Sequence, residues 1–304
     1  MPDVGNIGTR KQSCGDHKLA KILVIGATGN VGSGVVASLA AKGEQVVALV
    51  HSGGTALQTE GVEAVAGDLA NPASIAPAFE GVDRVFLVTR GTEDQVEMAT
   101  NAVDAAVSAG VSHLVRMSAF IPEPADQTVL GRQHAEIEAV VENSGIPYTI
   151  LRPTFFMQNI IGSRESVIGE GNIYFPFGDG KAGINDIRDI VDVAVEVLTS
   201  DGHEGQTYTI TGPESVGIAD VASALSDALG KPVNYIAVPV EAGVEAMVGM
   251  GMSQFMAETN GELMANFASN GADRTTDTVL KITGSPPRSV SDFAHDFSGM
   301  FVAG

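Results

Sequence analysis

One stretch decides the fold of this chain: Ile22-Leu23-Val24-Ile25-Gly26-Ala27-Thr28-Gly29-Asn30-Val31-Gly32. Its four leading apolar residues are typical of a strand that is buried on both faces in a parallel sheet. Apolar residues then recur at helical spacing over 31–40, and the next apolar run, 45–50, predicts a second strand. The stretch therefore opens a βαβ unit, with a glycine-rich turn between the first strand and the helix.

The alternation of strand and helix continues along the chain. Further strands are predicted at 62–66, 85–88, 113–117, 148–151 and 207–211, and helices at 72–79, 96–107, 130–141 and 187–198. Parallel strands that are separated by helices require right-handed crossovers. The predicted fold class is therefore α/β, a doubly wound parallel sheet (Rossmann) with a smaller C-terminal substrate-binding lobe.

Breaks in this rhythm suggest the domain boundaries. Residues 1–18 are polar, and we expect a flexible N-terminal tail there. We assign 19–153 and 186–211 to the dinucleotide-binding domain. The aromatic- and glycine-rich range 154–185 and the range 212–304 are assigned to the smaller lobe. In the latter range we expect a helix at 218–229, a strand at 233–238 and a methionine-rich helical region at 240–267.

Composition excludes several classes of protein. The 304 residues are 44% hydrophobic and 18% charged, with a formal net charge of -20, which disfavours binding to nucleic acid or to an anionic membrane. The single cysteine, Cys14, can form no internal disulfide and has no partners at metal-ligand spacing, so no metal site is predicted. No apolar run has the length of a membrane span and the N-terminus does not resemble a signal peptide, so we expect a cytoplasmic protein.

The glycine-rich turn predicts a dinucleotide site. Backbone N–H groups and the helix dipole at such a turn can hold a pyrophosphate. We assign to it Gly26, Thr28, Gly29, Asn30, Val31 and Gly32. Gly29 and Gly32 are expected to be needed for binding but not for folding. The alternative is a turn whose glycines are purely structural.

The end of the second strand favours NADP over NAD. NAD enzymes usually place an acid there for the ribose 2′-hydroxyl, but this chain has His51 and Ser52 followed by two glycines. A 2′-phosphate would meet no carboxylate at these residues. After the third strand, Asp68 and Leu69 are expected to contact the adenine. The alternative for Asp68 is an acid that merely precedes the helix starting at Pro72.

Three strings carry a family resemblance: GATGNVG at 26–32, GDL at 67–69 and SGIPYTILRPTFFMQN at 144–159. With them the sequence resembles the NmrA-like family of atypical short-chain dehydrogenases/reductases, and the likeness continues through Thr211–Glu214 to Gly284–Phe293. The resemblance implies an NAD(P)-binding Rossmann protein that is related to quinone oxidoreductases and to isoflavone/pinoresinol reductase-like proteins. The family also includes redox-sensing regulators, so it does not settle the function.

The resemblance directs attention to two candidate catalytic residues, Ser118 and His134. The wider superfamily has a serine after the fifth strand, where Ser118 stands, and a Tyr-x-x-x-Lys motif on the next helix. Here Leu130-Gly-Arg-Gln-His134 occupies that place, and leucine offers no proton to an alkoxide. Helical spacing puts His134 on the inward stripe, where imidazole can handle protons or orient the substrate. The alternatives are a structural histidine or one that touches the nicotinamide ribose.

The remaining site residues follow the carboxyl ends of later strands, where ligands bind in such sheets. The cofactor site is expected to include Val88, Thr89, Met117, Ser118, His134, Pro153 and Phe156. The substrate site is expected to include Phe155, Phe156, Asn159, Met252, Phe255 and Met256. The methionine-rich region would be a lid, or alternatively a helical pair packed on the core or on a second subunit.

Other acids are expected to have ordinary roles. We expect Glu136 and Glu138 on a solvated helix face. Asp186, Asp189 and Asp192 are expected mainly to complement a helix dipole.

These features predict an NADPH-dependent reductase that transfers a hydride to an aromatic or quinonoid small molecule. A quinone, quinone methide, enone or lignan/isoflavonoid-type phenolic accepts hydride into a delocalised anion and needs less help from a fixed acid. The alternative is an NADP(H)-binding redox sensor without turnover. We expect an aromatic small molecule as partner, and a monomer or homodimer.

Overall fold

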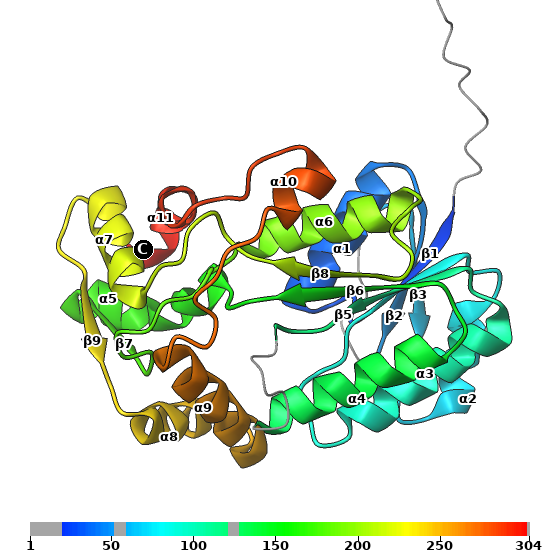
Figure 1. Ribbon diagram of the computed structural model, residues 1–304, viewed down its shortest axis with the longest axis horizontal. Helices are drawn as coiled ribbons and strands as arrows, with labels where there is room; N and C mark the ends of the chain where they lie inside the picture. The colour runs from blue at the N-terminus through cyan, green and yellow to red at the C-terminus, as the bar shows by residue number, and fades with distance from the viewer. Residues whose placement is uncertain (1–19, 52–58, 121–127, 303–304) are drawn as a thin grey trace, which may run out of the picture.

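A seven-stranded sheet forms the centre of the computed structural model, which describes residues 20–51, 59–120 and 128–302 (Figure 1). All neighbouring strands in it are parallel, in the order β3-β2-β1-β4-β5-β6-β8. The strands are β1 (Lys21–Ile25), β2 (Gln45–Val50), β3 (Val62–Ala66), β4 (Arg84–Leu87), β5 (His113–Met117), β6 (Tyr148–Pro153) and β8 (Gln206–Ile210). The predicted α/β fold is confirmed.

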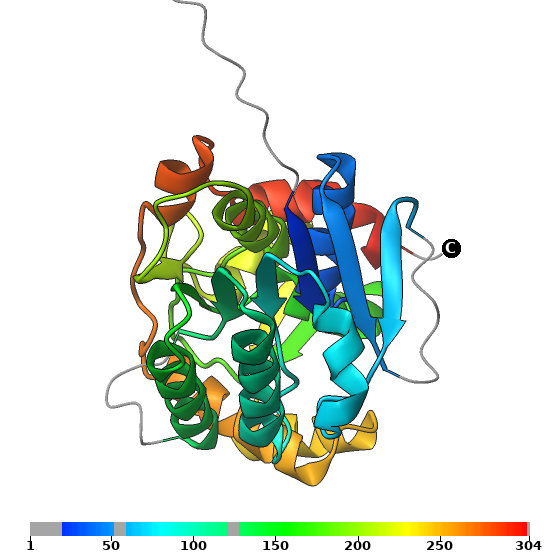
Figure 2. The same ribbon diagram turned by 90° about the vertical axis from the view of Figure 1, so that its right-hand side faces the viewer.

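Helices cover both faces of this sheet (Figures 1 and 2). One face carries α1 (Asn30–Ala41) and α6 (Ile187–Thr199), and the other carries α3 (Gln95–Ala109) and α4 (Val129–Asn143). The short α2 (Pro72–Ile75) and the 3-10 turn Ala76–Phe79 lie beside α3. Each face has its own buried aliphatic cluster, which explains why the strands are apolar on both sides.

The order of the strands places the ligand crevice. The chain moves outward from β1 to β3 and then returns to β4 on the other side of β1. The loops after β1 and β4 therefore diverge, and this opening at the carboxyl ends is where ligands bind in sheets of this kind.

The smaller lobe packs around a second core, and four of the phenylalanines there form a cluster of rings. The rings of Phe155, Phe177 and Phe267 lie 5.5 to 5.7 Å apart, and Phe175 is 5.6 Å from Phe155. The elements of the lobe are the 3-10 turn Met157–Ser163, α5 (Arg164–Glu170), β7 (Asn172–Phe175), α7 (Ile218–Leu229), β9 (Asn234–Ala237), α8 (Val240–Gly249), α9 (Gln254–Ala268), α11 (Val290–Phe297) and the turn Ser298–Phe301. Strands β7 and β9 form a parallel pair.

The sequence did not predict α5 and β7, because their segment follows neither a clear helical nor a clear strand period. Helix α10 (Thr278–Thr283) also differs from the expected division. It lies within the range assigned to the lobe, but Val279 packs in the core of the main sheet, beside α6. The expected tail, 1–18, lies outside the described residues.

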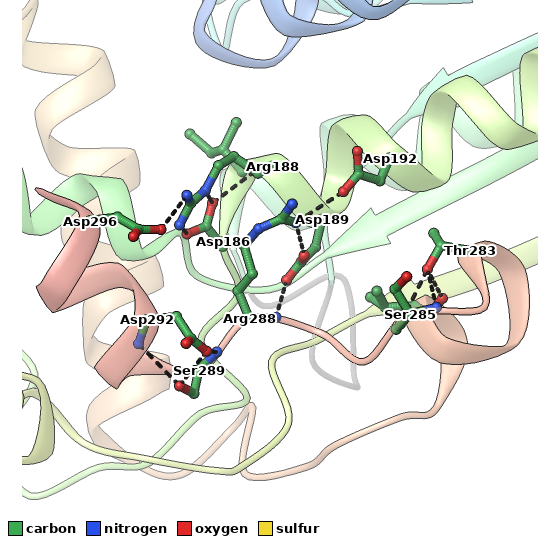
Figure 3. Close-up of polar contacts among 12 residues, drawn as sticks. Asp186, Arg188, Asp189, Asp192, Thr283, Ser285, Arg288, Ser289, Asp292 and Asp296 are labelled. Atoms are coloured by element: carbon green, nitrogen blue, oxygen red, sulfur yellow. Dashed lines mark hydrogen bonds and ion pairs between the residues drawn. The ribbon is translucent and has the colours of Figure 1, made fainter.

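Ion pairs fasten the C-terminal segment to α6 (Figure 3). Arg288, which precedes α11, donates from its backbone N–H to Asp189 at 2.8 Å and from its guanidinium to Asp189 and to Asp192. Arg188 joins Asp186 to Asp296 of α11. Asp186 also caps α6, accepting from the N–H of Arg188 at 2.9 Å, so the expected helix-dipole role is one part of a larger network.

None of the helices in the described part of the chain is both long enough and apolar enough to cross a membrane.

Candidate functional site

A cavity of about 310 Å³ lies at the carboxyl ends of the first four strands of the chain. Its lining brings together Gly26, Thr28 and Gly29 after β1, His51 after β2, Asp68 and Leu69 after β3, and Val88, Thr89 and Arg90 after β4. Asn30, Val31 and Gly32 form the first turn of α1 and are not part of this lining. Ser52 lies outside the described residues. Several residues of the predicted dinucleotide site therefore line one cavity, and their contact with the cofactor stays a prediction.

The glycine turn has the geometry that a pyrophosphate needs. The N–H of Gly29 donates to the carbonyl of Gly26 at 3.0 Å, and Gly26 has φ +79°, which disfavours side chains. A Cβ on Gly32 would stand 2.1 Å from the oxygen of Gly26. Gly29 is the N-cap of α1 and supplies no side-chain cap, so the helix amides are available to a phosphate.

The ribose end of the cavity differs from the sequence-based picture in one respect. An acid reaches His51 from the neighbouring strand, because the Asp68 carboxylate lies 4.0 Å from Nδ1 of His51. Asp68 also accepts from the N–H of Ala70 at 3.0 Å, which supports the ordinary turn role as well. Arg90 was not predicted. It is exposed and carries a positive charge into the same lining, and its place in the loop after β4 was the available signal.

A second cavity, of about 290 Å³, adjoins the first, and both are lined by Val88 and Thr89. The predicted residues that line it are Met117, Ser118, His134, Pro153, Phe155, Phe156 and Asn159. Helix α9 contributes Asn260, Leu263, Met264 and Phe267. All four lie in or at the end of the region expected as a lid, but none of them was named among the substrate-site residues. Met252, Phe255 and Met256 lie outside this lining, and their contact with substrate stays a prediction.

Ser118 and His134 meet in this second cavity. Ser118 Oγ lies 3.1 Å from Nδ1 of His134, although 16 residues separate them. Burial, followed by the nearby charges of Arg116 and Arg152, lowers the pKa of His134 from 6.5 to about 3. The imidazole is therefore neutral at physiological pH, and its hydrogen bond to Ser118 fixes how the ring is placed.

The rest of the pocket wall carries no charge among the described residues. Leu130, the residue expected from the resemblance to stand in the place of the superfamily's tyrosine, lines the cavity. Gln95, which the sequence did not single out, is 1% exposed and donates to Gln133. Such a wall suits an apolar aromatic ligand that is oriented by a few hydrogen bonds.

Behind this wall lies Glu138, and the prediction that it is on a solvated helix face is wrong. It is 4% exposed rather than solvated, because Arg152 of β6 donates to both of its carboxylate oxygens, from Nε at 2.9 Å and from Nη2. Glu136, its neighbour on α4, is exposed as expected. Sequence spacing alone does not show that an arginine on another element covers the acid.

In the described ranges, no group of three or more His, Cys, Asp or Glu side chains is arranged to hold a metal ion.

Comparison with known protein families matches residues 18–285 to the NmrA-like family. The chain belongs to the NmrA-like family. One relative is the NAD(P)H azoreductase of Xenophilus azovorans, which is 40% identical over 284 residues, 93% of this chain and 99% of the relative. The resemblance expected from the sequence motifs is thereby confirmed.

Solved structures of similar proteins share the architecture. The NADPH-dependent quinone oxidoreductase of Escherichia coli, in complex with NADPH, superimposes with a TM-score of 0.80 at 25% identity and covers 91% of this chain and 99% of its own. The triphenylmethane reductase of a Citrobacter species, in complex with NADP(H), gives 0.79 at 27% identity with the same coverage.

Proposed function

We propose that this protein is an NADPH-dependent reductase that transfers a hydride to an aromatic or quinonoid small molecule held between the sheet and α9. Membership of the class of NAD(P)H-dependent oxidoreductases follows from the azoreductase and quinone oxidoreductase relatives. The use of NADP agrees with the NADPH and NADP(H) complexes of two structural neighbours. The observation that carries the proposal is the adjoining pair of cavities with Ser118 and His134 in the second.

The first cavity would hold the cofactor. Amides at the start of α1 and the Gly26–Gly29 turn would bind the pyrophosphate, while His51 would meet the 2′-phosphate. Val88 and Thr89 line both cavities and would lie between the cofactor and the acceptor. When bound, NADPH supplies two electrons and one hydrogen and leaves as NADP⁺.

Ser118 and His134 would orient the acceptor through a hydrogen bond. Because the pKa of His134 is about 3, its imidazolium form is not the acid at neutral pH. In the tautomer with the proton on Nε2, the Ser118 hydroxyl donates to Nδ1 and the Nε2–H is left to donate to the acceptor. A neutral donor of this kind favours charge that develops on the acceptor. An acceptor whose anion is delocalised then takes its final proton from water.

A panel of acceptors tests this function. Purified protein with NADPH is given quinones, enones, azo compounds, triphenylmethane dyes and lignan-type phenolics, and the nicotinamide absorbance is followed. We expect turnover with at least one aromatic acceptor and none with a simple aliphatic ketone. Tight NADPH binding without turnover on any acceptor would instead support the redox sensor.

The cofactor preference has its own test. We expect the dissociation constant for NADPH to be lower than that for NADH, and the change His51→Asp to move the preference toward NADH by placing a carboxylate beside the 2′-phosphate. Fluorescence titration of both cofactors measures it. Wild-type protein that binds NADH more tightly would contradict the assignment.

A further inference from the structure

An arginine is buried behind the pocket, outside the residues that line it. Arg116 lies on β5, two residues before Ser118, and is 1% exposed. Its Nη1 donates to the carbonyl oxygen of Leu87 at 3.2 Å. Its Nε and Nη2 have no hydrogen-bond partner among the described residues. Unpaired buried donors lower stability, so packing alone does not account for an arginine at this position.

None of the hydrogen bonds of Arg116 in the described part of the chain goes to a carboxylate. The nearby Glu138 is bound by Arg152 and acts on the charge of Arg116 without a direct hydrogen bond. Burial lowers the pKa of Arg116 to about 10 and Glu138 opposes this, so the group stays charged at neutral pH. Inside a protein such a charge acts over a longer distance than it would in water.

The strand geometry places Arg116 behind the Ser118 and His134 pair. Side chains alternate along a strand, so Arg116 lies on the same face of β5 as Leu114, which shares a buried cluster with Val141 of α4. Ser118 follows directly after the strand. Ser118 is bonded to His134, and Glu138 follows one turn later on α4. The pair lines the pocket, whereas Arg116 does not.

Other charged groups near α4 lie farther from this arrangement. Arg132 and Glu136 are on the exposed side of α4. From α9, Glu262 accepts from the N–H of Val129 at the start of α4, at 2.8 Å. Helix α3 presents the uncharged Gln95 to the pocket. The charges that act on His134 are accordingly those of Arg116 and Arg152.

We propose that Arg116 is an electrostatic positioning residue for the reduction: its buried charge acts from behind on the Ser118 and His134 pair and favours the negative charge that the acceptor gains with the hydride. This inference rests on the proposed function. The described pocket lining holds no charged side chain, and Arg116 is a buried charge that lies behind this wall. The hydride adds two electrons to the acceptor, and the resulting negative charge is later neutralised by a proton.

Three variants separate charge from shape. Arg116→Met removes the charge and keeps most of the volume, while Arg116→Lys keeps the charge. Arg84→Met is the matched control, because Arg84 lies at the opposite end of the neighbouring strand and binds Asp201. If Arg116→Met does not fold, Arg116→Gln is the second uncharged variant.

The first readout needs no acceptor. Nuclear magnetic resonance follows the titration of the His134 ring, assigned by its loss in His134→Phe. We expect the titration midpoint to rise in Arg116→Met and to stay low in Arg116→Lys and Arg84→Met. An unchanged midpoint in Arg116→Met would overturn the electrostatic link to His134.

The second readout is single-turnover hydride transfer to the acceptor identified by the panel. We expect Arg116→Met to be slower by about tenfold or more with NADPH affinity unchanged, and Arg116→Lys to recover most of the rate. Equal slowing in both variants would assign the effect to shape, and a wild-type rate in Arg116→Met would remove Arg116 from the reaction. A wild-type protein that is itself inactive overturns the proposed function, which is a different result.

Discussion

At the scale of single residues, Gly29 and Gly32 of the glycine turn differ in how much space a Cβ would have. A Cβ at Gly29 would be 3.3 Å from the oxygen of Gly26, a contact that small shifts relieve. At Gly32 the corresponding distances are 2.1 Å to the oxygen and 2.7 Å to the carbonyl carbon of Gly26, both backbone atoms. The sequence pattern gave both glycines the same role, but the structure separates them.

We therefore predict different outcomes for alanine at these two positions. Gly29→Ala should weaken NADPH binding and leave the melting temperature near that of the parent, because only the phosphate is crowded. Gly32→Ala should lower both, because the backbone must move. Thermal melting and cofactor titration measure the two effects. Equal losses of stability in both variants would contradict this account.

His134 supports a prediction about pH. Its pKa of about 3 keeps it neutral from pH 5 to 8, so hydride transfer should show no inflection from this residue in that range. His134→Phe should slow single-turnover transfer by ~10²-fold with little change in NADPH affinity, because a donor to the acceptor is lost. An inflection near pH 6.5 that disappears in His134→Phe would show instead that the imidazole titrates during turnover.

At the scale of elements, the contacts between α6 and the segment before α11 hold distant parts of the chain together. Asp189 is 1% exposed, and Arg288 reaches it across 99 residues of sequence. Burial raises the pKa of Asp189, and the bonds from Arg288 oppose that rise. Without Arg288, the acid would be left buried and unpaired, which is costly whether it is charged or neutral.

Removing that arginine should therefore destabilise the protein. We predict that Arg288→Met lowers the free energy of unfolding by about 3 kcal/mol, the low end for breaking a buried pair, since Arg288 is partly exposed. Lys281→Met is the control, because its pair with Asp277 is exposed and should contribute under about 1 kcal/mol. Urea unfolding measures both. Similar small losses in the two variants would show that the Arg288 contacts are no stronger than a surface pair.

At the scale of the whole molecule, the sheet could be predicted from sequence because each strand is a short apolar run between helical patterns. The ends of the strands then placed the cofactor turn, Ser118 and Phe156 on one edge. The burial of Glu138 and Arg116 could not be predicted, because it depends on how α4 packs against β5 and β6 in the folded protein. The rotation of α9 likewise decides that Met264, not Met256, lines the pocket.

Buried neutral histidines make stability depend on pH. Burial, followed by the charge of Arg84, lowers the pKa of His113, and that of His134 is about 3. Below about pH 6.5 these histidines bind protons in the unfolded chain but stay neutral in the folded protein. The stability that the two neutral histidines contribute is therefore fully present above that pH. As the pH falls below it, the contribution of His134 to the free energy of unfolding should decrease by ~1.4 kcal/mol per pH unit.

We predict that the denaturation midpoint of wild type decreases when the pH is lowered from 7.5 to 5, and that the decrease is smaller in His134→Phe. Comparing variants removes the effect of the molecule's net charge, and the exposed His295→Phe is the control. Parallel pH dependences in wild type and His134→Phe would contradict the burial of a neutral imidazole at this site.

In the proposed reaction, NADPH in the first cavity delivers its hydride to an acceptor in the second. The most direct measurement is single-turnover oxidation of NADPH that carries deuterium on one or the other face of nicotinamide C4. Because the ring would be held in one orientation, we predict slower oxidation for one labelled face only, in the presence of an aromatic acceptor. Equal rates with both labelled cofactors and with unlabelled NADPH, or no oxidation with any acceptor, would contradict it.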